Sequence, residues 1–207
     1  MRLTVLVATA CLAAIPAFAR TVDSPSEQKA DLVRISAALN AIHSMQGGFV
    51  QIGPNGDVDQ GTIYLDKPGR VRFEYDPPNP MLIVSDGRTI TVKNRKLNTT
   101  DRYPLFGTPL HFILNDDVDL RNNNRIVDVR REDDNLIVDV KTNAAAWRAN
   151  VSIVFSGANL ELRQWTVVDA QGLSTTVALR EAKRVDSLPD SLFKPQDIAP
   201  PVRKTQD

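Results

Sequence analysis

A run of closely spaced antiparallel strands between residues 61 and 87 constrains the fold more than any other feature of the chain. The run reads GTIYLDKPGRVRFEYDPPNPMLIVSDG. It predicts strands over 62–65, 71–75 and 81–84, which are rich in β-branched and aromatic residues. A Lys-Pro-Gly turn follows the first strand, and Ser-Asp-Gly leads the last into another strand over 89–92. The intervening prolines interrupt pairing, because proline has no N–H to give.

The strand over 71–75 carries its aromatic residues on one face. Val71, Phe73 and Tyr75 alternate with charged residues, so their side chains point the same way. We expect this face to be the concave side of a curved sheet. Apolar residues fall on both faces over 81–84 and 136–138, which is typical of strands covered on both sides. The pattern allows either an apolar cavity or a barrel filled by its own side chains.

A helix is predicted before the strands. Ser24 is placed to cap it, Pro25 suits its first turn, and Glu27 completes a capping box. Apolar residues then recur at spacings of three and four, and they form one stripe: Leu32, Ile35, Leu39 and Ile42. We expect this helix to end near the glycines at 47 and 48.

The rest of the chain is dominated by predicted strands with short polar turns. Further strands are expected over 49–52, 125–131, 136–141, 151–155, 160–169 and 173–181. The segment 93–101 is expected to be irregular, and a short helix is expected to start at 108–109. About ten strands in this arrangement indicate a mainly β fold with some α, built on one strongly curved, barrel-like antiparallel sheet. Since no long linker divides the chain, we expect a single domain over 20–207.

The N-terminus reads as a secretion signal. A short positive start precedes an apolar run over 3–15, and Ala-Phe-Ala at 17–19 forms an A-x-A cleavage site. Residues 1–19 are therefore predicted to be a signal peptide that is cut between Ala19 and Arg20. The apolar run is shorter than the about 20 residues that a membrane-spanning helix needs.

Cys11 is the single cysteine and lies inside this signal. An alternative interpretation makes it the acylation site of a lipoprotein, but only a very short apolar run would then precede it. We therefore favour cleavage after Ala19. The mature chain would then have no disulfide and no thiol chemistry.

The sequence offers little support for catalysis or for nucleic-acid binding. It contains 25 basic and 25 acidic residues, whereas nucleic-acid-binding domains usually present a strongly basic face. His43 and His111 lie outside any metal-ligand or nucleophile motif. Asp116, Asp117 and Asp119 lack the glycine and distal glutamate of an EF-hand, which favours solvent-exposed roles over a calcium site. We expect no enzymatic activity, cofactor or metal.

The order of motifs between residues 61 and 87 resembles the LolA family of periplasmic lipoprotein carriers, and a weaker likeness covers nearly the whole mature chain. The resemblance implies an incomplete, open β-barrel covered by an α-helical lid, to which the segment 107–114 is similar. It also implies a lipid-binding cavity formed by the sheet, the first helix and the lid, with the candidate residues Leu39, Val71, Phe73, Tyr75, Leu110, Phe112, Ile113 and Leu114.

Lys67 stands where members of this family commonly have an arginine before the proline. In the family, that arginine is thought to latch the lid by donating hydrogen bonds to its carbonyls. Lysine keeps the charge but lacks the planar five-donor fork of arginine, so it can hold fewer directed bonds. Lys67 is therefore one candidate latch. Arg70 is the other, unless it is only a solvent-facing charge of the strand.

The resemblance implies a periplasmic chaperone for lipoproteins that the inner-membrane ABC transporter LolCDE releases. The acyl chains would be carried to the outer membrane, commonly to the acceptor LolB, and we expect the carrier to be a monomer. One alternative is a sensor similar to RseB, although RseB-like chains carry a further C-terminal domain and only a short tail follows Phe193 here. The other is an acceptor lipoprotein resembling LolB, which requires an acylated N-terminal cysteine.

Overall fold

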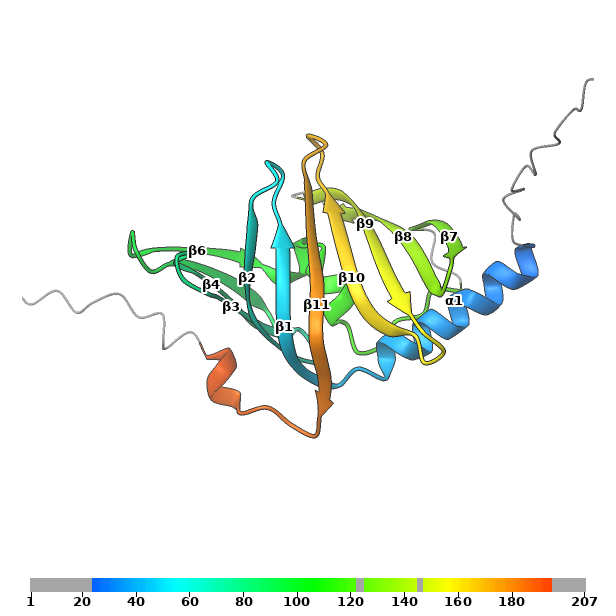
Figure 1. Cartoon of the computed structure of the whole chain (residues 1–207), viewed down its shortest axis with the longest axis horizontal. Helices are drawn as coiled ribbons and strands as arrows, with labels where there is room; N and C mark the ends of the chain where they lie inside the picture. The colour runs from blue at the N-terminus through cyan, green and yellow to red at the C-terminus, as the bar shows by residue number, and fades with distance from the viewer. Residues whose placement is uncertain (1–23, 122–124, 145–146, 195–207) are drawn as a thin grey trace, which may run out of the picture.

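Eleven antiparallel strands form one curved sheet in the computed structural model, which describes residues 24–121, 125–144 and 147–194 (Figure 1). The strands are β1 (Ser44–Ile52), β2 (Val58–Asp66), β3 (Arg70–Tyr75), β4 (Met81–Asp86), β5 (Thr89–Asn94), β6 (Thr99–Pro104), β7 (Ile126–Glu132), β8 (Asn135–Ala144), β9 (Trp147–Ser156), β10 (Glu161–Val168) and β11 (Ser174–Val185). The helices are α1 (Pro25–Asn40) and α2 (Leu110–Leu114), with 3₁₀ turns η1 (Leu105–Gly107) and η2 (Asp190–Phe193).

The strand order leaves the sheet open between β6 and β7. The order is β6-β5-β4-β3-β2-β1-β11-β10-β9-β8-β7, so β6 and β7 are consecutive in the chain yet form opposite edges. The chain must therefore cross from one edge to the other, and this crossing contains η1 and α2. The predicted fold class, a mainly β open barrel with a helical cover, is confirmed.

Helix α1 starts where the sequence predicts but ends earlier. Ser24 and Glu27 form the capping box, with the Glu27 N–H donating to Ser24 Oγ at 3.4 Å. The predicted end near Gly47 is wrong, because that residue lies within β1. A Cβ at Gly47 would lie 2.6 Å from the Cα of Ala182 in β11. Glycine is present there because two strand backbones pass very close at an irregularity in their pairing, not because a helix stops.

The segment 93–101, expected to be irregular, instead enters a further strand. Strand β6 pairs with β5, with Tyr103 opposite Ile90. All its residues are exposed, so no apolar alternation marks it in the sequence. A polar edge strand that ends in proline is a common protection against pairing with other chains. The other predicted strands are confirmed, with ends that differ by a few residues.

The predicted face of β3 is confirmed. Val71, Phe73 and Tyr75 are all buried and belong to one core cluster that also contains residues of α1 and α2. The ring of Phe49 in β1 makes edge contacts with both aromatic rings, at centroid distances of 5.3 Å to Phe73 and 5.1 Å to Tyr75. Such pairs stabilise a core by about 0.5–1.5 kcal/mol beyond burial alone.

The opposite face of β3 and β4 is covered by the C-terminal turn η2. The guanidinium of Arg72 donates to the carbonyl of Leu192 at 3.3 Å, and Arg70 lies 5.2 Å from the ring centroid of the buried Phe193. This cover explains why the apolar pattern of β4 does not alternate: Leu82 and Val84 form a separate small buried cluster.

The predicted signal peptide over 1–19, its cleavage between Ala19 and Arg20, and the alternative at Cys11 lie outside the described residues. Residues 195–207 of the C-terminal tail also lie outside the described residues. Among the helices that the structure describes, none is long and apolar enough to cross a membrane.

Candidate functional site

A largely apolar cavity of about 380 Å³ opens between the inner face of the sheet and the start of α2. Its walls come from the segment 108–110, from adjoining turns and from strands β1, β3, β4, β5, β6, β9, β10 and β11. A larger depression, of about 790 Å³, lies between α1 and the far ends of β10 and β11, but it is edged by charged side chains. The smaller cavity is therefore the better candidate for an apolar ligand.

Three of the eight predicted lipid-binding residues line this cavity: Phe73, Tyr75 and Leu110. Phe112 is only partly buried and packs against the core. The remaining predicted residues, Leu39, Val71, Ile113 and Leu114, are buried in the closed core and do not line the cavity. An acyl chain could reach them only if α2 moved away from the sheet.

Sequence reasoning missed the side of the cavity that β10 and β11 form. Trp165, Val167 and Val177 line it, and the Trp165 ring meets Phe73 at a centroid distance of 6.3 Å. The available signal was the alternation along the predicted strands over 160–169 and 173–181, which places these residues on one face of each strand. Which face turns inward depends on how β11 pairs with β1, and that pairing joins distant parts of the chain.

Tyr75 places a polar group at the cavity wall without adding charge. Its hydroxyl donates to Gln51 Oε1 at 2.7 Å. Burial raises the pKa of Tyr75 to about 12, and the charge of Asp59 acts in the same direction. The phenol is therefore neutral over the physiological range and already has a hydrogen-bond partner. The Tyr75 hydroxyl therefore needs no hydrogen bond from a ligand, and the cavity can hold a purely apolar group.

Helix α2 is held at its C-terminal end by the turn between β2 and β3. The Gly69 N–H donates to the carbonyl of Leu114 at 2.9 Å. At the other end, Thr108 Oγ1 donates to the carbonyl of Leu105 at 2.9 Å, and Phe106 is exposed with its ring against His111. With a length of five residues, α2 has little stability of its own, so its position depends on these contacts and on core packing.

Lys67 makes a different contact from the one that the family resemblance implies. Its ammonium donates to the carbonyl of Leu39 at 2.8 Å, which belongs to α1 and not to the lid segment. The position of the β2–β3 turn explains this contact. The backbone N–H of Lys67 donates to the carbonyl of His43, which lies just beyond the end of α1, so the Lys67 side chain starts close to that helix. Burial lowers the pKa of Lys67 to about 8, and the charge of Asp116 opposes this shift.

Arg70, the other candidate latch, faces the C-terminal turn. It pairs with Asp66 and with Asp190, besides lying over the Phe193 ring. Within the described residues, then, the β2–β3 turn meets both helices through Lys67 and Gly69, whereas Arg70 fixes η2.

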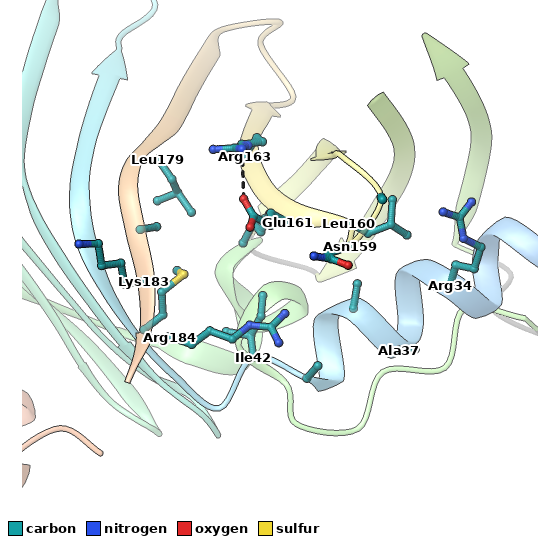
Figure 2. Close-up of a pocket in the computed structure, with 16 residues that line it drawn as sticks. Arg34, Ala37, Ile42, Asn159, Leu160, Glu161, Arg163, Leu179, Lys183 and Arg184 are labelled. Atoms are coloured by element: carbon teal, nitrogen blue, oxygen red, sulfur yellow. Dashed lines mark ion pairs between the residues drawn. The ribbon is translucent and has the colours of Figure 1, made fainter. Parts of the chain in front are cut away.

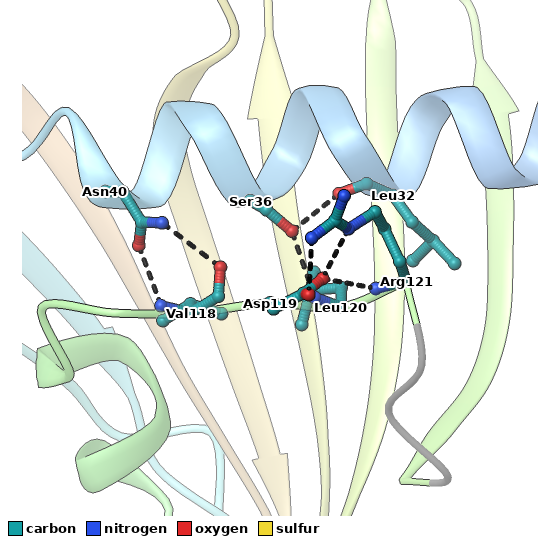
Figure 3. Close-up of polar contacts among 7 residues, drawn as sticks. All are labelled: Leu32, Ser36, Asn40, Val118, Asp119, Leu120 and Arg121. Atoms are coloured by element: carbon teal, nitrogen blue, oxygen red, sulfur yellow. Dashed lines mark hydrogen bonds and ion pairs between the residues drawn. The ribbon is translucent and has the colours of Figure 1, made fainter.

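The segment that follows α2 runs along α1 and is fastened to it (Figure 3). Asn40 accepts from the Val118 N–H at 2.9 Å and donates to the Val118 carbonyl at 3.1 Å. One turn earlier, Ser36 Oγ accepts from the Leu120 N–H at 3.1 Å and donates to the Leu32 carbonyl at 2.7 Å. Side chains spaced four residues apart on α1 thus fix the backbone that leads away from α2.

The part of the chain that the structure describes contains no group of three or more His, Cys, Asp or Glu side chains arranged to hold a metal ion. The buried polar groups near α1 and the β2–β3 turn have partners in the hydrogen bonds given above. The arrangement is suited to enclosing an apolar ligand beside a short helix.

Comparison with known proteins agrees with this geometry. The sequence model of the family described as "Outer membrane lipoprotein carrier protein LolA" matches residues 40–196. The chain is 26% identical over 193 residues to an outer-membrane lipoprotein carrier protein of Dechloromonas aromatica, with 91% of this chain and 90% of the relative covered. It is 27% identical over 175 residues to a protein of the same name from Legionella pneumophila, covering 77% of this chain and 82% of the relative.

Among solved structures, a DUF1329 family protein from Desulfovibrio piger is similar in fold. Its TM-score is 0.50 at 10% identity, and the match covers 86% of this chain and 100% of that chain. At this identity the likeness concerns the fold alone.

Proposed function

The chain belongs to the LolA family of outer membrane lipoprotein carrier proteins, and from this premise we propose that it carries lipoproteins through the periplasm by enclosing their acyl chains. The inner-membrane transporter LolCDE would supply the cargo, and an outer-membrane acceptor such as LolB would receive it. The signal peptide over 1–19 would direct the protein to the periplasm, where a single domain over 20–207 would act as a monomer.

The observation that carries this proposal is the apolar cavity beside α2. Burying one CH₂ group stabilises a complex by about 0.8 kcal/mol, so free acyl chains in water are strongly unfavourable. A cavity of about 380 Å³ lies near the lower end of the range for small-ligand sites, which is about 300–1,000 Å³. The combined volume of several long acyl chains is larger than this cavity. Loading therefore requires α2 to leave the sheet.

The energetics of this exchange favour cargo. Displacing α2 exposes the buried side chains of Ile113 and Leu114, and exposing each of them to water costs about 1.5–3 kcal/mol. The sum corresponds to burying roughly four to eight CH₂ groups, which is less than one long acyl chain provides. Once the cargo leaves, the same two side chains return to the core. The cycle needs no covalent step, cofactor or catalytic residue.

Depletion of the protein in cells tests the proposal. We expect outer-membrane lipoproteins to accumulate in the inner membrane, as measured by membrane fractionation, and wild-type protein to restore their sorting. Leu110→Asp, which places a charge in the cavity wall, is expected not to restore it. The matched control Leu97→Asp changes a side chain that is 68% exposed, so it is expected to complement fully.

Normal lipoprotein sorting in depleted cells would refute the carrier role. Labelling with palmitate separates the acceptor alternative, since incorporation at Cys11 would identify an anchored lipoprotein.

A further inference from the structure

A second depression, of about 790 Å³, separates the C-terminal half of α1 from β10 and β11 (Figure 2). We call it the basic groove. Its floor contains the buried side chains of Ile42, Met45, Leu162 and Leu179. None of these residues lines the 380 Å³ cavity, so the groove is a separate site.

The side of the basic groove that α1 forms carries small side chains. Ala37 and Ala41, one turn apart on α1 and at its C-cap, are exposed and line the groove. Alanine side chains leave room for another backbone to approach the helix closely. The two alanines therefore leave open space beside this end of α1.

The edges of the basic groove carry an excess of positive charge. Arg34 comes from α1, and Lys183 and Arg184 come from the end of β11. Figure 2 shows the Arg184 guanidinium extending from β11 toward the end of α1 near Ile42. The acidic lining residue Glu161 is already paired with Arg163, at 3.1 Å.

The charges at the β11 end are not used within the fold. Among the described residues, the side chains of Lys183 and Arg184 form no hydrogen bond or ion pair. Arg34 lies 3.3 Å from Asp31, but Arg131 already holds that carboxylate with bonds of 2.8 and 2.6 Å. Since the whole chain has equal numbers of basic and acidic residues, this excess is local.

The basic groove is also elongated. A neighbouring depression of about 370 Å³ shares Arg34, Ala158 and Leu160 with it and continues to the turn between β7 and β8. The basic groove has an apolar floor, and its continuation is lined by Arg131, Asp133 and Asp134. Two connected depressions match an extended polypeptide better than a compact small molecule. The floor lies between α1 and the β9–β10 hairpin, below the level of both. A flat membrane surface would therefore not reach it.

We propose that the basic groove binds an amphipathic peptide segment of a partner protein, with apolar side chains on the floor and acidic side chains beside Lys183 and Arg184. This surface is distinct from the lipid cavity, and the inference does not depend on which cargo the cavity takes.

Selection of 12-residue peptides from a random displayed library against the whole mature protein tests this proposal. We expect enrichment of sequences that combine Asp or Glu with large apolar residues. The selected peptides, made synthetically, are expected to bind the double variant Lys183→Glu, Arg184→Glu at least tenfold more weakly in calorimetry. Both residues are exposed, so this variant is expected to fold normally.

Two further variants separate charge from shape. Ala41→Trp fills the groove from an exposed position without changing charge, and it is expected to weaken the same peptides at least tenfold. The control Arg88→Glu, Lys96→Glu makes the same charge change on exposed residues outside the groove and is expected to leave binding unchanged. Each variant is checked for the wild-type unfolding midpoint.

Several results would overturn the proposal. One is selection without acidic enrichment, and another is equal peptide affinity for wild type and the groove variants. Failure to select any peptide would also reject it. So would groove-dependent binding of vesicles made of phosphatidylglycerol and phosphatidylcholine, because that result would assign the surface to anionic lipid.

Discussion

The ammonium of Lys67 donates a hydrogen bond of 2.8 Å to the carbonyl of Leu39 at the C-terminal end of α1. Cations near helix C-termini are stabilising, because the last carbonyls lack partners within the helix. Two residues on, the Gly69 N–H bonds the carbonyl of Leu114 in α2. One short turn therefore fixes the ends of both helices that pack on the sheet.

The buried ammonium makes stability depend on pH. Burial lowers the pKa of Lys67 to about 8 in the folded protein, while an unfolded chain has the ordinary value of about 10.4. Between these values the unfolded state binds more protons, so stability rises with pH. We expect a gain of about 2 kcal/mol from pH 7 to pH 9.5.

Urea unfolding of wild type and Lys67→Met at the two pH values measures this term. The difference between the two proteins isolates Lys67, since other groups titrate in both. Methionine is one atom shorter than lysine and uncharged, so at pH 7 Lys67→Met reports the lost bond to Leu39 together with the relieved desolvation of the ammonium. An identical pH dependence in the two proteins would show that the Lys67 ammonium is not held in a desolvated site.

The carboxylate of Asp31 fastens α1 to the edge strand β7. It is fully buried and accepts two hydrogen bonds from Arg131, at 2.8 and 2.6 Å. Asp31→Asn removes the charge and one acceptor, which is expected to cost about 1.5–3 kcal/mol in chemical denaturation. Asp119→Asn is the control, because its pair with Arg121 is exposed and is expected to contribute nothing measurable. Equal stabilities of the two variants would contradict a fastening role for Asp31.

The strands other than β6 and the β3 side of the cavity were predictable because they depend on local patterns, whereas the fully exposed β6 shows no apolar alternation. Alternation alone assigns Phe73 and Tyr75 to one face, and the capping box marks the start of α1. The contribution of Trp165 was not predictable, since it depends on the pairing of β1 with β11 across most of the chain. The partner of Lys67 was missed for a related reason. The glycines at 47 and 48 look like a helix end in the sequence, although they permit close strand contact, and α1 in fact ends at Asn40, which brings the Leu39 carbonyl to the helix end.

Helix α2 is expected to separate from the sheet more easily than the sheet unfolds. Ile113 is buried in the core, and a charge there is strongly unfavourable as long as α2 stays packed. In Ile113→Asp we therefore expect the amides of α2 to lose protection from hydrogen exchange, while those of β1, β2 and β11 keep it. Uniform loss of protection across the sheet would instead identify α2 as an inseparable part of the core.

Filling the cavity is expected to weaken acyl-chain binding without weakening the fold. Val177 lines the cavity from β11, so the added ring of Val177→Phe has free space of about 380 Å³ to enter. We expect the affinity for a fluorescent long-chain fatty acid to fall at least tenfold, which is about 1.4 kcal/mol. The unfolding midpoint is expected to stay equal to that of wild type or to rise, because the new ring gains contacts that the empty space lacked. Val127→Phe makes the same change at an exposed position of β7 and is expected to leave affinity unchanged. Undiminished binding by Val177→Phe in a folded protein would place the acyl-chain site elsewhere in the molecule.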